Sequence, residues 1–238
     1  MAKKYVIFGA TGSIGSALCE QLYEDKADCH LVSKSEDEVK KLANKLSYTY
    51  SVCDVLELNF TKKLSEDLAR TEILGIAYCI GSINLKPFRL TKSKDFVSTY
   101  VLNLVAAADI IREFQSNLTL NNGSIVLFST VAAKKGFTNH SIISPAKAGV
   151  EGLTVSLAAE LAPKIRVNCI APSLTKSKMS QILLKNTKSE ESIAKLHPLK
   201  RIGKGTDAAS VAKFLLSNDS SWITGQIIGV DGGRSSIG

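Results

Sequence analysis

A glycine-rich turn is the first part of the sequence with the composition of a ligand site. The segment GATGSIG, residues 9–15, separates a short apolar run ending at Phe8 from an apolar stretch with helical spacing. Glycines at such a junction allow a tight turn and a close approach of the backbone to a pyrophosphate, which the free N–H groups of the next helix can bind. The predicted dinucleotide contacts are Gly9, Thr11, Gly12, Ser13, Ile14 and Gly15. An ordinary strand-turn-helix connection is the alternative.

A lysine follows the second apolar run, where the adenosine ribose of a dinucleotide would lie. Ser33 and Lys34 occupy this place. An acidic side chain here would accept bonds from a free 2′-hydroxyl, whereas a cation fits a 2′-phosphate. Lys34 therefore favours NADP. NAD stays possible because Glu36 and Asp37 lie close by, and a solvated surface lysine is the alternative interpretation.

The second half of the chain places a few chemically active side chains among apolar segments. Asn103 lies inside a long apolar helical stretch, Thr130 follows a strand-like run, and Lys147 lies near the start of another helical stretch. His140 precedes it, and histidine is the side chain whose ordinary pKa lies nearest neutral pH. Each also has a plain structural interpretation: an amide bonded to a neighbouring carbonyl, the end of a strand, a helix-start lysine and a surface or capping histidine.

These residues need a scaffold, and the apolar patterning predicts one. Short β-branched runs alternate with longer stretches of helical spacing, which is typical of a parallel sheet covered by helices on both faces. The predicted strands are 5–8, 29–32, 48–52, 73–79, 124–128, 165–170 and 226–230. The predicted helices are 14–23, 36–46, 62–69, 94–114, 146–161 and 207–216. We expect one α/β domain over residues 1–238 with a seven-stranded, doubly wound parallel sheet in a three-layer sandwich, and a substrate lid at about 173–206.

Composition excludes several other classes. The chain has 238 residues, 45% of them hydrophobic, and a net charge of +8. Its lysines are dispersed and not arranged in a stripe with aromatics, so we expect no nucleic-acid partner. Five scattered cysteines without a C-x-x-C pair predict buried thiols and no metal site. No apolar stretch is long enough for a signal core or a membrane span, so we expect a cytoplasmic protein without a membrane partner.

Taken in order along the chain, the motifs resemble those of the short-chain dehydrogenase/reductase family. The matching segments are GATGSIG at 9–15, CDV at 53–55, Gly81, RVNCIAPS at 166–173, and TGQ to VDGG at 224–233. The resemblance covers essentially the whole chain. It implies a Rossmann-type fold with a nicotinamide dinucleotide as cofactor. It further implies cofactor contacts from Asp54, Val55, Ile80, Gly81, Lys147, Pro172 and Ser173.

The resemblance also implies a catalytic set, from which one member is missing. The family uses a serine to orient the substrate oxygen, a tyrosine to exchange its proton, a lysine on the nicotinamide ribose and an asparagine in a proton relay. Thr130, Lys147 and Asn103 match three of these positions, but Ile143 stands where the tyrosine belongs. His140, seven residues before Lys147, resembles the spacing of the enoyl-reductase branch, and Ser13-Ile14 resembles its turn.

Three functions remain open on the sequence. The favoured one is an NADP-dependent oxidoreductase for a small carbonyl or alcohol, with the proton supplied by water or His140. The second is a catalytically impaired dinucleotide-binding sensor or scaffold, and a nucleic-acid binder is a distant third. We expect the substrate pocket to form from residues 173–206 and 82–90. The broadly apolar helices that carry Asn103 and Lys147 predict a homodimer or homotetramer.

Overall fold

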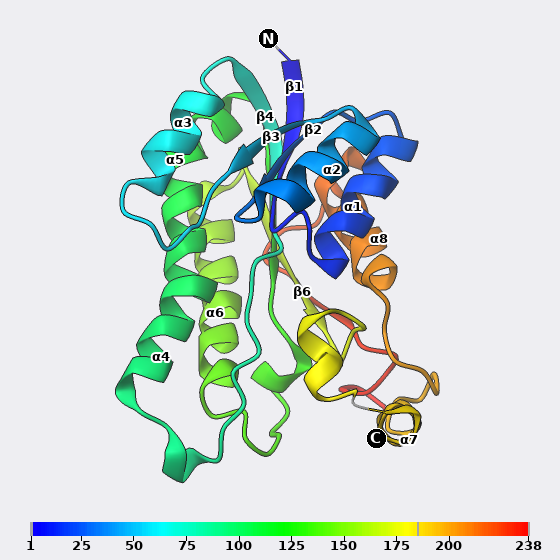
Figure 1. Cartoon of the computed structure of the whole chain (residues 1–238). Helices are drawn as coiled ribbons and strands as arrows, with labels where there is room; N and C mark the ends of the chain where they lie inside the picture. The colour runs from blue at the N-terminus through cyan, green and yellow to red at the C-terminus, as the bar shows by residue number, and fades with distance from the viewer. Residues whose placement is uncertain (1, 185, 238) are drawn as a thin grey trace.

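The computed structural model describes residues 2–184 and 186–237, and within them a sheet of seven parallel strands forms the centre of the molecule (Figure 1). The strands are β1 (Ala2–Phe8), β2 (Cys29–Ser33), β3 (Thr49–Val52), β4 (Thr71–Tyr78), β5 (Ser124–Phe128), β6 (Arg166–Pro172) and β7 (Ile227–Val230). Their order is β3-β2-β1-β4-β5-β6-β7. Every residue of β2 and β5 is buried, as expected for strands covered on both faces.

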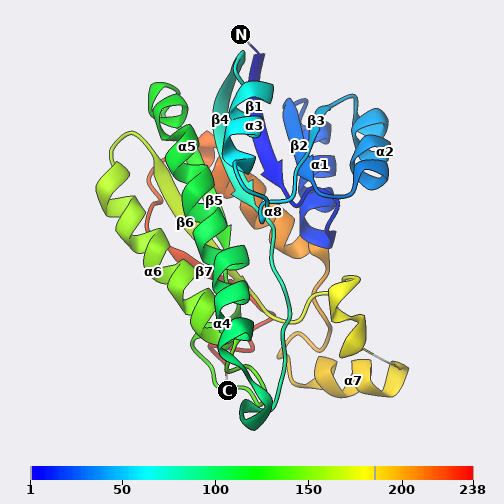
Figure 2. The same cartoon turned by 60° about the vertical axis from the view of Figure 1, so that its left-hand side comes forward.

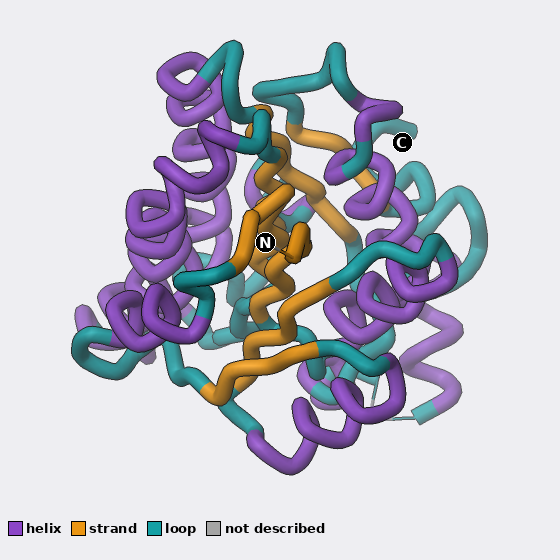
Figure 3. The backbone as a smooth tube through the Cα atoms, turned by 90° about the horizontal axis from the view of Figure 1, so that it is seen from above, coloured by secondary structure: helices purple, strands orange, loops and turns teal. Residues whose placement is uncertain are grey.

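Helices cover both faces of this sheet and give it three layers (Figures 2 and 3). One face packs against α3 (Phe60–Asp67), α5 (Ala106–Leu120) and α6 (Ile143–Leu161). The other packs against α1 (Ser13–Glu24), α2 (Glu36–Leu46) and α8 (Gly205–Leu216). The remaining helices are α4 (Ser93–Tyr100) and α7 (Thr187–Lys195). The predicted fold class, a Rossmann-type doubly wound α/β sandwich, is confirmed.

The sheet reverses its direction of winding beside β1. This strand pairs with β2 on one side and with β4 on the other, and Phe8 lies opposite Tyr78 at the end of both strands. The connections after β1 and β4 therefore leave the sheet side by side in opposite directions, and a crevice opens between them. The turn at Gly9 and the segment at Gly81 both lie at this crevice.

The predicted long helix over 94–114 is divided. The structure has α4, then a π-helical turn over Val101–Val105, then α5. Asn103 lies in the π-helical turn, a form common at functional sites. The next helix, α6, begins at Ile143 and not at residue 146, so Lys147 lies one turn inside it.

The predicted lid contains more regular structure than its composition indicated. Residues 173–206 include a short 3-10 helix at Met179–Ile182 and α7, and residue 185 of this segment lies outside the described residues, as do residues 1 and 238 of the predicted domain. In Figure 1 both elements lie at the carboxyl ends of the strands. The segment is thus placed to cover a ligand in the crevice. Within the described part of the chain, no helix is long and apolar enough to cross a membrane.

Candidate functional site

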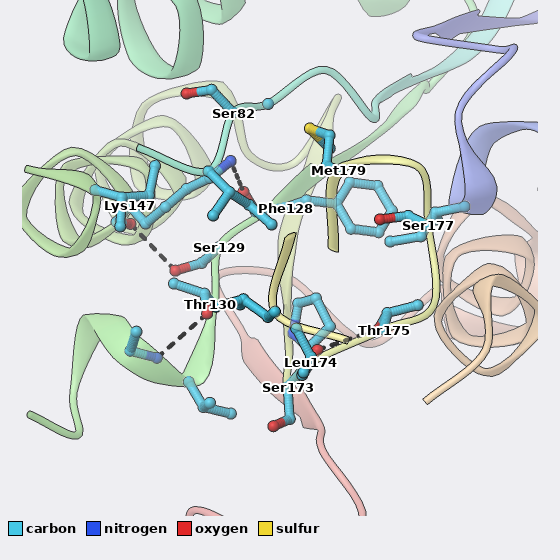
Figure 4. Close-up of a pocket in the computed structure, with 18 of the residues that line it drawn as sticks. Ser82, Phe128, Ser129, Thr130, Lys147, Ser173, Leu174, Thr175, Ser177 and Met179 are labelled. Atoms are coloured by element: carbon cyan, nitrogen blue, oxygen red, sulfur yellow. Dashed lines mark hydrogen bonds between the residues drawn. The ribbon is translucent and has the colours of Figure 1, made fainter. Parts of the chain in front are cut away.

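A cavity of about 320 Å³ opens at the crevice (Figure 4). Its walls come from the turn after β1, the segment after β4, the loop between β5 and α6, and the predicted lid. The sequence-predicted residues that line it are Gly12, Ser13, Ile14, Ile80, Gly81, Thr130, His140, Lys147, Pro172 and Ser173. Segments far apart in the sequence therefore meet at one cavity, and the predicted pocket segments 82–90 and 173–206 both contribute to it.

The turn after β1 has a shape that only glycine allows. Gly9 adopts a φ of +73°, and a Cβ atom there would lie 3.0 Å from the carbonyl carbon of Cys79. A Cβ atom on Gly15 would lie 2.3 Å from the carbonyl oxygen of Gly9. The helix that follows has no side-chain cap and no acidic residue in its first turn. Its N-terminal N–H groups are therefore available to an anion.

Two hydroxyls and one lysine form the expected ribose end of the site. The Thr11 and Ser33 hydroxyls lie 2.9 Å apart in a hydrogen bond. Lys34 is exposed and forms no ion pair with any described residue, whereas Glu38 nearby is bound by Lys178 from the lid segment. A free cation thus stands beside the end of β2, where a 2′-phosphate would need one.

Lys147 is buried at the other end of the crevice. Its Nζ donates a 2.8 Å hydrogen bond to the carbonyl oxygen of Phe128, the last residue of β5. Burial disfavours the charged ammonium and lowers the pKa of Lys147 to about 8. Gly81 lies against it, because a Cβ atom on Gly81 would be 3.3 Å from Lys147 Nζ and 3.2 Å from Asn103 Oδ1. The lysine and the amide therefore converge on Gly81.

Asn103 is fully buried with half of its amide unused. Its Nδ2 donates to the Thr99 carbonyl at 2.9 Å and to the Ser82 hydroxyl at 3.2 Å. Its Oδ1 has no hydrogen-bond partner among the described residues. Buried polar atoms are almost always hydrogen-bonded, so this oxygen marks a place for a water or a ligand donor beside Lys147 and Gly81.

Three of the four catalytic positions implied by the resemblance, those of Thr130, Ile143 and Lys147, line the cavity, whereas Asn103 is buried outside its wall. Thr130 follows β5, and its hydroxyl accepts a 3.3 Å hydrogen bond from the Ala132 N–H (Figure 4). Ile143 is 5% exposed and lines the same cavity. His140 donates from Nδ1 to the Thr138 carbonyl at 2.7 Å, which leaves Nε2 without a partner in the described chain. Position 143 thus presents only hydrocarbon, whereas His140, another lining residue, carries a ring nitrogen without a partner in the described chain.

The remaining predicted contacts lie around this centre. Asp54 accepts the Leu56 N–H at 3.0 Å, and Val55 is buried under the expected adenine position. Ser173 follows the end of β6 and donates to Nε2 of buried His197 at 2.8 Å, because Nδ1 of that ring must donate to the carbonyl of Ile193. The Ser173 hydroxyl is therefore engaged, and its backbone N–H and carbonyl bond to the Val230 carbonyl and the Thr175 hydroxyl, so Ser173 lines the cavity as part of its frame.

Phe137 and Arg234 are among the residues of the cavity wall that the sequence analysis did not predict. Phe137 belongs to the loop before α6, and Arg234 belongs to the tail after β7. The guanidinium carbon of Arg234 lies 4.9 Å from the centre of the Phe137 ring. No local pattern brings them together, since almost a hundred residues separate them. The VDGG segment before Arg234 was the one available signal.

Comparison with known proteins agrees with this geometry. A family model described as Enoyl-(Acyl carrier protein) reductase matches residues 9–235. The 3-oxoacyl-[acyl-carrier-protein] reductase FabG of Rickettsia bellii is 33% identical over 233 residues, which cover 96% of this chain and 95% of that protein.

Two solved structures are similar over nearly the whole chain. A short-chain type dehydrogenase/reductase from Mycobacterium ulcerans superposes with a TM-score of 0.91 at 25% identity, covering 98% of this chain and 90% of the other. A gluconate 5-dehydrogenase from Burkholderia cenocepacia, in complex with NADP and tartrate, has the same fold, with a TM-score of 0.92 at 22% identity and coverage of 98% and 95%. The chain belongs to the short-chain dehydrogenase/reductase family.

Proposed function

We propose that the protein is an NADP-dependent short-chain oxidoreductase that transfers a hydride to or from a small carbonyl or alcohol substrate, with a proton donor other than the family's tyrosine. The observation that carries this proposal is the convergence of buried Lys147 and the unpartnered Oδ1 of Asn103 on Gly81, beside the cavity that Thr130 lines. A plain scaffold has no need for a buried lysine next to a buried, unpaired amide oxygen.

The residues present fit a nicotinamide dinucleotide. The turn at Gly9 and Gly15 leaves room that a Cβ atom would fill, and the N-terminus of α1 offers N–H groups for the pyrophosphate. Asp54 and Val55 would lie against the adenine. Lys147 would donate to the nicotinamide ribose. When bound in its reduced form, the cofactor supplies the hydride.

Lys34 supports the phosphorylated form of the cofactor. It is exposed, lies at the end of β2 and has no carboxylate partner in the described chain. The Glu38 carboxylate that could have bound a ribose hydroxyl is instead tied to Lys178. A 2′-phosphate would thus meet a free cation, and the structure of the Burkholderia cenocepacia relative contains NADP.

The proton must come from another group because Ile143 cannot donate one. The Thr130 hydroxyl would orient the substrate oxygen. His140 lines the cavity, its Nε2 has no partner in the described chain, and it is our candidate for the donor, with a water bound at Asn103 Oδ1 as the other source. If neither group delivers a proton, the second function applies: a dinucleotide-binding sensor or scaffold that retains the cofactor site without efficient turnover.

Cofactor titration tests the proposal first. We expect NADPH to bind to the purified protein more tightly than NADH, as followed by cofactor fluorescence. Lys34→Asp should weaken NADPH binding by about 10-fold or more, because a charge-assisted contact to the phosphate becomes a repulsion. Lys41→Asp makes the same charge change at an exposed position within α2 and should leave NADPH binding unchanged.

The second step is hydride transfer, followed by NADPH absorbance across a panel of aldehydes and ketones. Turnover supports the oxidoreductase, and tight NADPH binding without any turnover supports the sensor or scaffold. Failure of both nucleotides to bind contradicts both functions.

We also propose that the active form is a homodimer or homotetramer. Part of the apolar surface of the helices around Asn103 and Lys147 packs inside the chain, since Val150 and Ala158 are buried. Val97, Val105 and Val155 remain 62%, 43% and 50% exposed. Apolar side chains gathered on α4, the π-helical turn and α6 suit pairing with the same helices of another subunit. Light scattering after gel filtration measures the assembly directly.

A further inference from the structure

The charges that line the cavity are all of one sign. Among the described lining residues there is no aspartate or glutamate, and the fixed cations are Lys147 and Arg234. The proposed function uses Lys147 for the cofactor. Arg234 has no part in it. A guanidinium on the wall of a cavity without carboxylates is a binding group for an anion unless the protein neutralises it.

The protein does not neutralise it within the described chain. The guanidinium of Arg234 donates no hydrogen bond and forms no ion pair there, and its one described contact is the face of the Phe137 ring. Lys135 binds the backbone oxygen of Arg234 at 3.0 Å, which adds positive charge nearby and holds the tail. Partial burial lowers the pKa of Arg234, as expected for a cation without a counter-ion.

Asp231 in the tail and Glu151 in α6 have partners of their own. Asp231 accepts the Gly233 N–H at 2.9 Å and the Ser235 N–H at 2.8 Å, so its carboxylate closes the turn of the tail. Glu151 lies 3.6 Å from Lys134 Nζ and accepts the Ser129 hydroxyl. Neither forms an ion pair with Arg234. The pairing group for this guanidinium therefore has to arrive with a ligand.

Apolar side chains make up much of the remaining wall, beside hydroxyls such as those of Thr130 and Ser177. The apolar lining side chains include Ile83, Leu85, Val131, Leu174, Met179 and Ile193. Such a surface favours an apolar body, while a single guanidinium favours a singly charged, planar group that accepts paired N–H bonds. A carboxylate matches both the charge and the geometry, and a phosphate dianion would exceed the charge.

We propose that Arg234 is the substrate's carboxylate-binding subsite, and that the enzyme acts on keto acids or hydroxy acids with an apolar chain between the reacting carbon and the carboxylate. This inference rests on the proposed oxidoreductase function for the reacting end. The subsite itself rests on the cavity. The Phe137 ring packs against the guanidinium, and the His140 ring, whose centre lies 5.4 Å from that of Phe137, belongs to a residue lining the same cavity.

The experiment compares straight-chain keto acids, with the carbonyl at successive carbons, and the methyl ester of each acid. With NADPH saturating, wild-type kcat/KM should favour the best acid over its ester by about 10-fold or more. Arg234→Met should lower kcat/KM for the acid by about 10- to 100-fold, the range for loss of a charged hydrogen-bonded pair, and should leave the ester nearly unchanged.

Two controls separate charge from structure. Arg234→Lys should recover part of the acid rate, and Arg70→Met, at an exposed position outside the cavity wall and both pocket segments, should change the rate with neither substrate. NADPH binding should be unaltered in all three variants. Equal loss for acid and ester would show a structural role and overturn the subsite, as would an ester preferred by the wild type.

A binding measurement keeps this test separate from the proposed function. Calorimetric titration of acid and ester into the NADPH-loaded protein needs no turnover. Acid binding that exceeds ester binding, and is lost in Arg234→Met, supports the subsite even if no hydride is transferred. If NADPH does not bind, the same titrations on the free protein still measure the subsite. Absence of any difference between acid and ester in binding and in turnover overturns it.

Discussion

The two ends of the cavity are built in different ways. At the nucleotide end, the backbone itself makes the site: Gly9 and Gly15 are fixed by distances of 3.0 Å and 2.3 Å that no side chain tolerates, and α1 presents its N–H groups. At the substrate end, side chains from the loop before α6 and from the tail make the wall. A binding site made by the backbone tolerates few substitutions. A cavity wall made by side chains can be altered by substituting one residue at a time. Ile143 and Arg234 both lie at the end that can vary.

Ile143→Tyr is the strongest test of this contrast. A tyrosine at position 143 would lie one turn before Lys147 on the same face of α6, so the two side chains would be neighbours. If the substrate end differs from the family only by the missing donor, this pair restores the donor. We expect the rate of hydride transfer at saturating NADPH to rise by about 10²- to 10⁴-fold, the usual contribution of a positioned general acid.

Ile143→Phe is the matched control for this gain. It adds the ring without the hydroxyl and should not raise the single-turnover rate. A tyrosine variant no faster than the phenylalanine variant would mean that the substrate end has been rebuilt around a different donor. His140→Gln should then abolish the remaining rate.

Lys147→Met tests the nucleotide end of the cavity, where we expect weaker cofactor binding and slower turnover. Removing the ammonium should weaken NADPH binding and lower kcat/KM by about 10- to 100-fold, because the bond to the ribose disappears. In the wild type, kcat/KM should fall as pH rises through about 8, since Lys147 then loses its proton. Steady-state rates between pH 6 and pH 10 measure both effects, and a flat alkaline limb would contradict the assignment.

Stability should respond to the same titration with the opposite sign. The pKa of Lys147 is about 8 in the folded chain and about 10.5 when unfolded, so between these values the unfolded chain binds more protons. This group therefore destabilises the fold below pH 8, and its unfavourable contribution fades as pH rises toward 10.5. Urea unfolding should show the wild type gaining stability relative to Lys147→Met over this interval.

Sequence patterns predicted elements wherever burial leaves a local trace. The strand over 124–128 and the helix over 36–46 have the predicted bounds, because one is a wholly buried apolar run and the other has a clear apolar stripe. The helix α6 begins three residues before the predicted start and contains Pro145 in its first turn. Proline is tolerated in the first turn of a helix, where its missing N–H has no partner to lose. α7 was missed because none of its residues is buried, so it has no stripe.

The candidate site likewise contains features that the sequence predicted and features that only the three-dimensional structure shows. The glycine turn was predicted from its local composition and its place after a strand, whereas Lys147 and Asn103 were predicted from their positions in the family resemblance. Arg234 could not be placed, since its contact with Phe137 depends on how a tail and a loop pack at the end of the sheet. The unpaired Oδ1 of Asn103 was also outside the reach of sequence, because a partner's absence is visible only in three dimensions.

We expect the smallest effect, a change in the rate of NADPH dissociation, from a surface contact between the lid segment and the nucleotide end of the cavity. Lys178, in the lid segment, forms an ion pair with Glu38 at the start of α2, and the Ser13 hydroxyl donates to the Lys176 carbonyl at 2.7 Å. Exposed ion pairs contribute about 0 to 1 kcal/mol, so Lys178→Met should raise the dissociation rate of NADPH by no more than about 5-fold. Lys45→Met breaks the exposed pair with Glu20, 2.6 Å long and outside the cavity wall, and should not change that rate. Stopped-flow displacement of NADPH measures both variants.

Because salt screens exposed charges, the difference in dissociation rate between wild type and Lys178→Met should shrink at high ionic strength. A difference that persists there would mean that Lys178 holds the lid segment through packing and not through charge.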